Sequence, residues 1–235
     1  MIPSMKKRFW TDVSVTPEST GFIVQLDGHE IRTPSKARLI LPTKPLAEEV
    51  ADEWRAVKTE VLPQKMPMTR RANAAIDKVA PQRTAVETML AEYGETDLLC
   101  YRAGHPQELA ERQARAWDPL LDWAARDLGA RLIVTSGVVP VAQDRDALRR
   151  LGDALGAFST FQLTAVHDLI TLSGSLVIGL AACAGAAEIE TLWDASQVDE
   201  MWQVQLWGED DEARDATGRK RQDFLDAFRF FFSSR

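Results

Sequence analysis

The stretch that decides the fold lies near the N-terminus and reads Phe22-Ile23-Val24-Gln25-Leu26-Asp27-Gly28-His29-Glu30-Ile31-Arg32-Thr33. Phe22, Val24 and Leu26 occupy every second position before Asp27-Gly28, and His29, Ile31 and Thr33 continue the period of two after it. This is the pattern of strands with one buried face. Asp-Gly is a preferred sequence for a two-residue hairpin turn. The same alternation precedes the stretch at Val13 and Val15. The sequence therefore predicts a small antiparallel β unit, with a further short strand at 38–41.

The hydrophobic period changes at Thr43, a residue suited to cap the N-terminus of a helix. From there apolar residues recur every three or four positions, which predicts an amphipathic helix, at Leu46, Val50, Trp54, Val57 and Val61. Further helices are expected at residues 70–79, 84–93, 106–128 with a bend or junction at Asp118-Pro119, 144–155, 161–184, 188–207 and 222–232. Residues 131–135 and 138–141 are expected to be short strands or extended connectors.

These patterns predict an α+β protein in which a small N-terminal antiparallel β domain precedes a larger multihelical C-terminal domain. We place the β-rich domain, with its following helix and connector, at residues 1–80 and the helical domain at 81–235. The uncharged run 169–187 is nearly long enough to cross a membrane. Its many small residues make it weakly apolar, so we expect two core helices broken near Ser173-Gly174-Ser175.

Composition and charge exclude several classes of function. The 235 residues carry a net charge of −7, which argues against a nucleic-acid-binding protein. Residues 1–83 hold 14 basic and 10 acidic side chains (net +4), whereas the remainder holds 14 and 25 (net −11), so the two parts could steer a polarised partner. Two distant cysteines, Cys100 and Cys183, form neither a disulfide framework nor a zinc site. Without a recognisable signal or transit segment, we expect a cytoplasmic protein with no stable membrane insertion.

The most acidic part of the chain also carries two tryptophans. From Glu188 to Asp215 there are ten acidic side chains and one basic one. Aromatic rings amid such charge either anchor the segment to its own core or form the apolar centre of a binding patch with an acidic rim. Trp202 fits the anchor better, and Trp207 fits both roles. Because Gly208 follows Trp207, we expect that ring at a helix end and half exposed.

A search for catalytic chemistry yields no candidate. The histidines, His29, His105 and His167, lie in separate segments. His105 and Glu108 form a spaced pair at a helix start, but no further ligand of suitable spacing follows for a zinc site. His167 and Asp168 are adjacent on a helix, so they should not serve one serine as a triad. No phosphate-binding or dinucleotide-binding glycine loop is present. We therefore expect no catalytic residue, no metal site and no cofactor.

An ordered series of segments resembles one protein family along nearly the whole chain. The segments are Arg8-Phe9-Trp10, Leu26-Asp27-Gly28 with Ile31-Arg32-Thr33-Pro34, Glu53-Trp54, Pro67-Met68-Thr69-Arg70 with Asn73 and Ile76-Asp77, Asp97-Leu98-Leu99-Cys100-Tyr101-Arg102, Gln113-x-x-x-Trp117-Asp118-Pro119-Leu120, Gly174-Ser175, Asp199-Glu200-x-Trp202-Gln203 and Trp207-Gly208-Glu209-Asp210. The family is that of the F-type ATP synthase assembly chaperones that attend the alpha subunit, the Atp twelve family.

The resemblance implies a β domain joined to a helical domain and a role that is not enzymatic. A chaperone of this family would bind unassembled alpha subunit and prevent its aggregation until beta subunit replaces it. A bacterial, cytoplasmic and monomeric member is expected. The resemblance places the partner-binding residues in the acidic segment, at Asp199, Glu200, Trp202, Gln203, Trp207, Glu209, Asp210 and Glu212. Gln205 departs from the glutamate expected of the family at that position.

Two other hypotheses remain open from the sequence. In the first, a metal-assisted hydrolase uses the acidic cluster 209–212 together with Asp199 or Glu200, because carboxylates bind hard cations. Consecutive carboxylates do not converge on one point, so a solvated acidic rim is the simpler interpretation of that cluster. In the second, a peripheral membrane protein uses the uncharged run 169–187.

Overall fold

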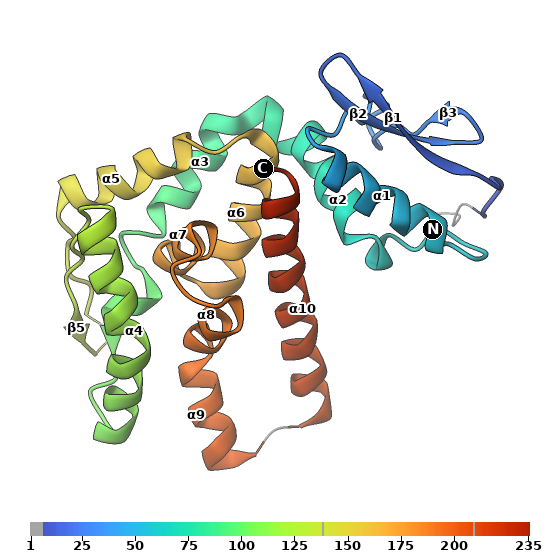
Figure 1. The fold of residues 1–235 in the computed structure, drawn as a ribbon. Helices are drawn as coiled ribbons and strands as arrows, with labels where there is room; N and C mark the ends of the chain where they lie inside the picture. Colours follow the sequence, from blue (N-terminus) through green and yellow to red (C-terminus); the bar gives the residue numbers. More distant parts are fainter. Residues whose placement is uncertain (1–6, 138, 209) are drawn as a thin grey trace. The chain divides into compact units, whose positions relative to one another are not determined.

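The structure is a computed structural model that describes residues 7–137, 139–208 and 210–235. The chain divides into two compact units. The first comprises the chain up to Arg83 together with Ser159–Ala165 and Arg229–Arg235, and the second comprises Thr84–Phe158 and Val166–Phe228. A small antiparallel sheet near the N-terminus is followed by a helical remainder, so the predicted α+β class is confirmed (Figure 1).

Three strands form the sheet of the first unit in the order β1 (Val13–Glu18), β2 (Gly21–Leu26) and β3 (His29–Glu30), all antiparallel. The register sets Val13 opposite Leu26, and both side chains are buried. A period of two along each strand keeps these apolar residues on one face of the sheet.

The turn between β2 and β3 is the predicted hairpin turn. Asp27 and Gly28 both have positive φ angles, 48° and 80°, as a type I′ turn requires. The Asp27 carboxylate accepts hydrogen bonds from the backbone N–H groups of Thr11 (3.0 Å) and Asp12 (2.8 Å). These bonds lower the pKa of Asp27, and they tie the turn to the chain that leads into β1.

The strand predicted at 38–41 does not form. Arg38 pairs with Arg32 and Leu41 pairs with Phe22, each as an isolated antiparallel bridge. The two ends of the segment thus pair with different parts of the chain, Arg32 after β3 and Phe22 at the start of β2. The segment therefore does not pair along a single strand. The prediction was wrong because alternating burial, with Leu41 fully buried, does not require a continuous ladder.

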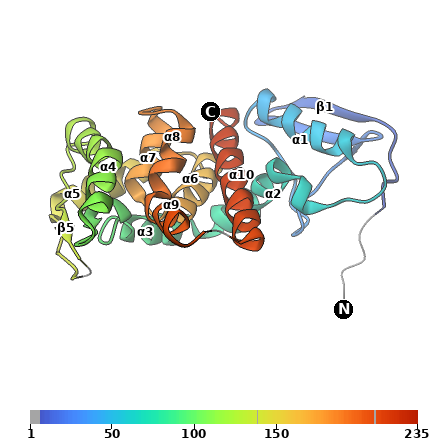
Figure 2. The ribbon, with the colours of Figure 1, turned by 90° about the horizontal axis from the view of Figure 1, so that it is seen from below.

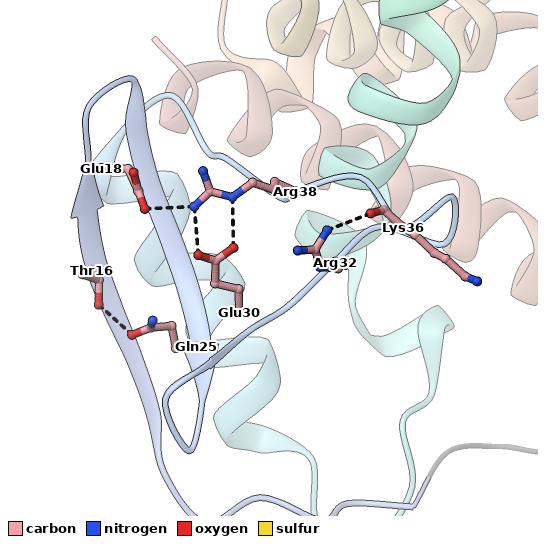
Figure 3. Close-up of polar contacts among 7 residues, drawn as sticks. All are labelled: Thr16, Glu18, Gln25, Glu30, Arg32, Lys36 and Arg38. Atoms are coloured by element: carbon pink, nitrogen blue, oxygen red, sulfur yellow. Dashed lines mark hydrogen bonds and ion pairs between the residues drawn. The ribbon is translucent and has the colours of Figure 1, made fainter.

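Polar contacts hold this segment against one face of the sheet (Figure 3). The Arg38 guanidinium donates to the Glu30 carboxylate at 2.8 and 3.0 Å and to Glu18 at 2.9 Å. Across β1 and β2, the Thr16 hydroxyl donates to the side-chain oxygen of Gln25 at 2.9 Å. The charged groups are partly exposed, so each ion pair adds at most about 1 kcal/mol.

Helix α1 (Lys44–Ala56) packs against β1 and β2 (Figures 1 and 2). Thr43 caps it as predicted, since its hydroxyl oxygen accepts from the Leu46 N–H. The helix ends at Ala56 and does not reach residue 61. Val57 takes an extended conformation, and the chain then pairs with residues 7 and 8.

The connector after α1 leads into α2 (Pro67–Ala74), which continues as a π-helical turn, η2 (Ala75–Val79). Short 3₁₀ turns flank this region at Pro63–Lys65 and Ala80–Gln82. The Glu53 carboxylate accepts from the backbone N–H groups of Met68 (2.6 Å) and Thr69 (2.8 Å). A carboxylate at a helix N-terminus satisfies otherwise unpaired donors and interacts favourably with the helix dipole.

The two late segments of the first unit carry aromatic and polar contacts within that unit. Phe161 and Phe230 stack with ring centroids 6.2 Å apart. The Glu49 carboxylate accepts from Arg229 at 2.9 Å and from the Ser233 hydroxyl at 3.0 Å. The Thr43 hydroxyl, which also caps α1, donates to the carbonyl oxygen of Ser233.

The remaining helices are α3 (Arg83–Glu92), η4 (Leu98–Cys100), α4 (Gln107–Asp127), α5 (Arg145–Gly156), α6 (Thr160–Ser173), α7 (Leu176–Ala184), α8 (Ile189–Ser196), α9 (Val198–Trp207) and α10 (Asp211–Ser233). Helix α7 lies between α4 and α6 in both views (Figures 1 and 2), and its residues from Leu176 to Cys183 are buried. The uncharged run is therefore two core helices, as predicted, broken at Gly174, whose φ is 71°. In the described part of the chain, no helix has the length and apolarity to cross a membrane.

Three predicted helices differ in extent or continuity. Helix α4 runs through Pro119 without a break, because that ring is exposed and water can solvate the carbonyl left without a donor. The helix predicted over 188–207 is interrupted at Gln197, whose backbone leaves helical geometry with φ −111° and ψ 12°. The last helix begins at Asp211, eleven residues before the predicted start at Gln222.

Of the two segments expected to be short strands or extended connectors, the first contributes one short strand. Among the described residues of this unit, the strands are β4 (Tyr101–Arg102) and β5 (Thr135–Ser136), which pair in parallel. Within 131–135, the backbone of Ile133 is hydrogen-bonded to the Gln143 side chain and not to another strand. The Gln143 side chain accepts from the Ile133 N–H at 2.7 Å and donates to its carbonyl at 3.0 Å. Residues 139–141 form no strand, and Val138 lies outside the described residues.

A fully buried carboxylate fastens η4 to α7. Asp97 accepts from the Leu99 N–H (3.0 Å), the Ser175 hydroxyl (2.7 Å) and the Val177 N–H (3.1 Å). Burial raises the pKa of Asp97 to about 6, although these hydrogen bonds oppose the shift. The family segments around Asp97 and Gly174-Ser175 thus meet in one buried polar cluster.

Candidate partner-binding surface

The predicted surface is built on α9 and on the turn that joins it to α10. No side chain of α9 is fully buried, although six of its ten residues are tryptophan, valine, methionine or leucine. Such a helix needs either support from a neighbouring element or a partner to cover it. Helix α4 supplies the support along one side.

The first contact with α4 is made by Asp199. Its carboxylate accepts from the Gln113 side-chain amide at 2.6 Å, and the Gln113 carbonyl oxygen accepts from the Ala103 N–H at 2.7 Å. Gln113 is only 2% exposed, so both bonds are largely shielded from water. One turn further along α4, the Trp117 indole donates to the carbonyl of Ala195 at 2.7 Å, which anchors the end of α8.

The second contact is made by Trp202. The Arg112 guanidinium lies 4.8 Å from the centroid of the Trp202 ring and also donates to the side-chain oxygen of Gln205 at 2.6 Å. A cation over an indole face is a favourable electrostatic contact. Trp202 is half-buried, so its geometry is that of an anchor within the protein. Gln205, the residue that departs from the family pattern, is bound to the same arginine.

The opposite side of α9 is exposed. Glu200, Gln203 and Trp207 are separated by three and four residues, which places them along one face of the helix. Trp207 is 78% exposed and is the last residue of α9, with Gly208 as the C-cap at φ 80°. The prediction that this ring lies at a helix end is confirmed, and it is more exposed than expected.

Two further apolar side chains, missed from the sequence, are exposed beside this face. Met201 is 51% exposed and Leu206 is 55% exposed. The hydrophobic periodicity gave no sign of them, because apolar residues occur on every side of α9. Helix α4 covers only one side, and this can be seen only in the tertiary structure.

The turn after α9 separates the predicted acidic residues by role. The Asp210 carboxylate accepts from the Ala213 N–H at 2.7 Å and so caps α10. Glu212 is exposed in the first turn of that helix, where a negative charge suits the helix dipole. Asp211 pairs with Arg214, and the predicted residue Glu209 lies outside the described residues.

The structure gives no support to the metal-assisted hydrolase. Within the described ranges, no three His, Cys, Asp or Glu side chains come together as ligands for a metal ion. The serines that could form a catalytic triad with His167 and Asp168 make other hydrogen bonds. The Ser175 hydroxyl donates to Asp97 and the Ser173 hydroxyl donates to the carbonyl of Leu169. Among the described hydrogen bonds, the His167 ring contacts Asp168 and neither serine.

Burial makes both thiols poor nucleophiles. The pKa of Cys100 rises to about 12, chiefly through burial, and burial also raises the pKa of Cys183. Neither thiol is ionised near neutral pH.

The arrangement of α9 is suited to contact a macromolecule, because a supported helix presents a face that is both charged and apolar.

Comparison with known proteins is consistent with that geometry. The sequence profile described as "ATP12 chaperone protein" matches residues 7–125, slightly more than half of the chain. The chain belongs to the ATP12 chaperone family. The resemblance predicted from the sequence is thus confirmed. The profile match ends before α9, so it does not itself identify the exposed face.

Individual relatives align over most of the chain. The crystal structure of Atp12 from Paracoccus denitrificans is 46% identical, covers 97% of this chain and 98% of its own, and superposes with a TM-score of 0.94. A crystal structure of a protein from Agrobacterium tumefaciens is 38% identical over 98% of this chain and 87% of its own, also with a TM-score of 0.94. The mitochondrial protein atp12 of Schizosaccharomyces pombe is 24% identical over 89% of this chain and 76% of its own.

Proposed function

We propose that this ATP12 family member is an assembly chaperone of the F-type ATP synthase, which binds unassembled alpha subunit until beta subunit replaces it. Family membership supports the chaperone role. A subunit awaiting its neighbours exposes apolar assembly surfaces and is prone to aggregate. Covering such a surface requires binding and exchange but no chemical step. We therefore propose a monomeric, non-enzymatic protein of the bacterial cytoplasm.

The observation that carries the proposal is the exposed face of α9. Trp207 is 78% exposed at the end of a helix whose other side is fixed to α4. Large apolar groups left in water commonly mark interaction sites, and tryptophan is enriched among the residues that dominate binding energy. Met201 and Leu206 extend the apolar area, while Glu200 and Glu212 give it an acidic rim.

The predicted site residues divide into two roles on this proposal. Glu200, Gln203, Trp207 and Glu212 contact the client directly, because their side chains face water. Asp199, Trp202 and Asp210 position the helix and the turn, because they hold contacts within the protein. An acidic rim requires a client surface that is basic at its edge and apolar at its centre.

The experiment is a binding and aggregation assay with purified alpha subunit. We expect Trp207→Ala to weaken binding by about 2 kcal/mol, or about thirtyfold, since a central tryptophan is a frequent hot spot. Glu200→Lys should also weaken binding and should reduce its dependence on salt. Both variants should keep the urea midpoint of the parent, because neither side chain packs in the core.

Two matched controls separate a site from a general effect. Val139→Ala truncates another exposed apolar side chain (71% exposed), and Asp153→Lys makes the same charge change on the exposed surface of α5. Both should bind alpha subunit like the parent protein. Full binding and full protection from aggregation by the Trp207→Ala and Glu200→Lys variants would exclude α9 as the client-binding surface.

A further inference from the structure

A hollow of about 670 Å³ lies on the first unit, far from α9 in the sequence. It is formed by two short segments, residues 7–10 and 58–60. The segments pair through an isolated bridge between Lys7 and Glu60 and through the Arg8 N–H, which donates to the Thr59 carbonyl at 2.8 Å. No element of the proposed client-binding face contributes to it.

Buried groups fix the shape of the hollow. The Arg8 guanidinium donates to the carbonyls of Val57 (2.6 Å) and Trp10 (3.0 Å), which joins the two segments from the inner side. Trp10 is 3% exposed and packs edge-on against Trp54, with ring centroids 5.2 Å apart. The site is thus held by backbone pairing, a fixed guanidinium and the contact of buried Trp10 with half-buried Trp54.

The lining of the hollow carries more positive than negative charge. Among the described residues, Lys7, Arg8 and Lys58 form no ion pair, and the partners of the Arg8 side chain are backbone carbonyls. Glu60 supplies the single negative charge of its lining. Elsewhere on this unit, Arg38 and Arg55 are paired with carboxylates. Cations without carboxylate partners beside a hollow attract an anionic group.

An exposed aromatic ring accompanies these cations. Phe9 lines the hollow, is 75% exposed, and has the edge of Trp10 as its one aromatic neighbour in the described structure, with centroids 5.2 Å apart. The fold does not bury this ring, so it is available to cover an apolar side chain of a partner. Three cations around an aromatic ring are complementary to a peptide with both carboxylates and an apolar side chain.

We propose that this basic hollow is a second docking surface for a protein partner, and that it takes an acidic segment bearing one apolar or aromatic side chain. Its charge is opposite to that of the α9 face, so the two surfaces select different parts of a partner. Nucleic acid is disfavoured, because three cations on a chain with a net charge of −7 neutralise few phosphates. The proposal rests on the proposed chaperone function only in taking the partner to be a protein.

The test uses full-length protein and a fluorescein-labelled peptide, Glu-Glu-Phe-Glu-Glu, followed by fluorescence anisotropy. We expect saturable binding that weakens as salt is raised. The Lys7→Glu, Lys58→Glu double variant should bind at least tenfold more weakly. Phe9→Ala should also lose at least tenfold, which corresponds to uncovering one apolar side chain.

The matched control is the Lys36→Glu, Lys44→Glu double variant, which makes the same change in net charge at exposed lysines outside the hollow. It should bind the peptide like the parent protein. Trp207→Ala should also bind the peptide normally, so failure of this proposal is distinguishable from failure of the α9 surface. Urea midpoints equal to the parent's establish that each variant is folded.

Four results would overturn the proposal. The peptide fails to bind, or the control double variant loses as much affinity as the hollow variant. Inorganic phosphate or a short oligonucleotide displaces the peptide from the hollow at lower concentration than unlabelled peptide does. Alternatively, sedimentation shows self-association that the hollow variants abolish, which would make a second copy of the chain the occupant.

Discussion

Removing the Gln113 side chain should destabilise the protein and loosen α9 at the same time. Gln113 is 2% exposed and makes two hydrogen bonds of 2.6 and 2.7 Å, to Asp199 and from the Ala103 N–H. Gln113→Ala leaves that N–H without its partner, which costs about 1–3 kcal/mol. The half-buried Asp199 carboxylate loses one hydrogen bond, which water partly replaces, so we assign this loss a cost of about 1 kcal/mol in stability. The sum is about 3 kcal/mol.

The assay is urea denaturation followed by tryptophan fluorescence, with Gln107→Ala as the control. Gln107 lies on the same helix, is exposed, and bonds Glu111 at 2.8 Å in solvent. The control should change the free energy of unfolding by less than about 0.5 kcal/mol. A double-mutant cycle of Gln113→Ala with Asp199→Ala should give a coupling energy of about 1 kcal/mol.

The consequence for function follows from the same contact. Because the Gln113 bond fixes the start of α9, Gln113→Ala should reduce affinity for the proposed client, alpha subunit, although the buried Gln113 side chain is not part of the exposed face. A loss of stability below about 1 kcal/mol, together with a coupling energy indistinguishable from zero, would refute the assignment of Gln113 as the support of α9.

Two other perturbations test the core. Gly179→Ala would place a Cβ 2.4 Å from Ile170 Cγ1, so we expect the free energy of unfolding in urea to fall by about 1–2 kcal/mol even after the gain in helix propensity. The control Gly218→Ala, whose added Cβ meets no atom within 4 Å, should instead stabilise the protein by about 0.5–1 kcal/mol. Equal effects of the two substitutions would contradict the packing described. The pKa of Asp97 is about 6 in the folded protein, compared with an ordinary value of 3.8. Between these pH values the folded state binds a proton that the unfolded state has lost. The free energy of unfolding should therefore fall by up to about 3 kcal/mol as pH rises from about 4 to 6. The difference in unfolding free energy between wild type and Asp97→Asn, measured across that window, should show this slope, and a flat difference would contradict it.

Local sequence was sufficient wherever the determining interaction is local. Asp27-Gly28 encodes a turn that needs two positive φ angles, Thr43 encodes a helix cap, and Gly174 encodes the break between two core helices. Each depends on neighbours a few residues away. The exposure of Trp207 at a helix end could be predicted in the same way, because Gly208 follows it directly in the sequence.

Interactions between distant residues decided the rest. The segment at 38–41 pairs at its two ends with different partners, and the helix expected over 188–207 is interrupted at Gln197. Hydrophobic periodicity reveals neither feature. Sequence located the acidic, tryptophan-bearing segment, but it could not separate Asp199, held by Gln113 from 86 positions earlier, from Glu200, which faces water. Adjacent residues on a helix point about 100° apart, so only the place of α4 determines which of them supports the helix and which is left for a partner.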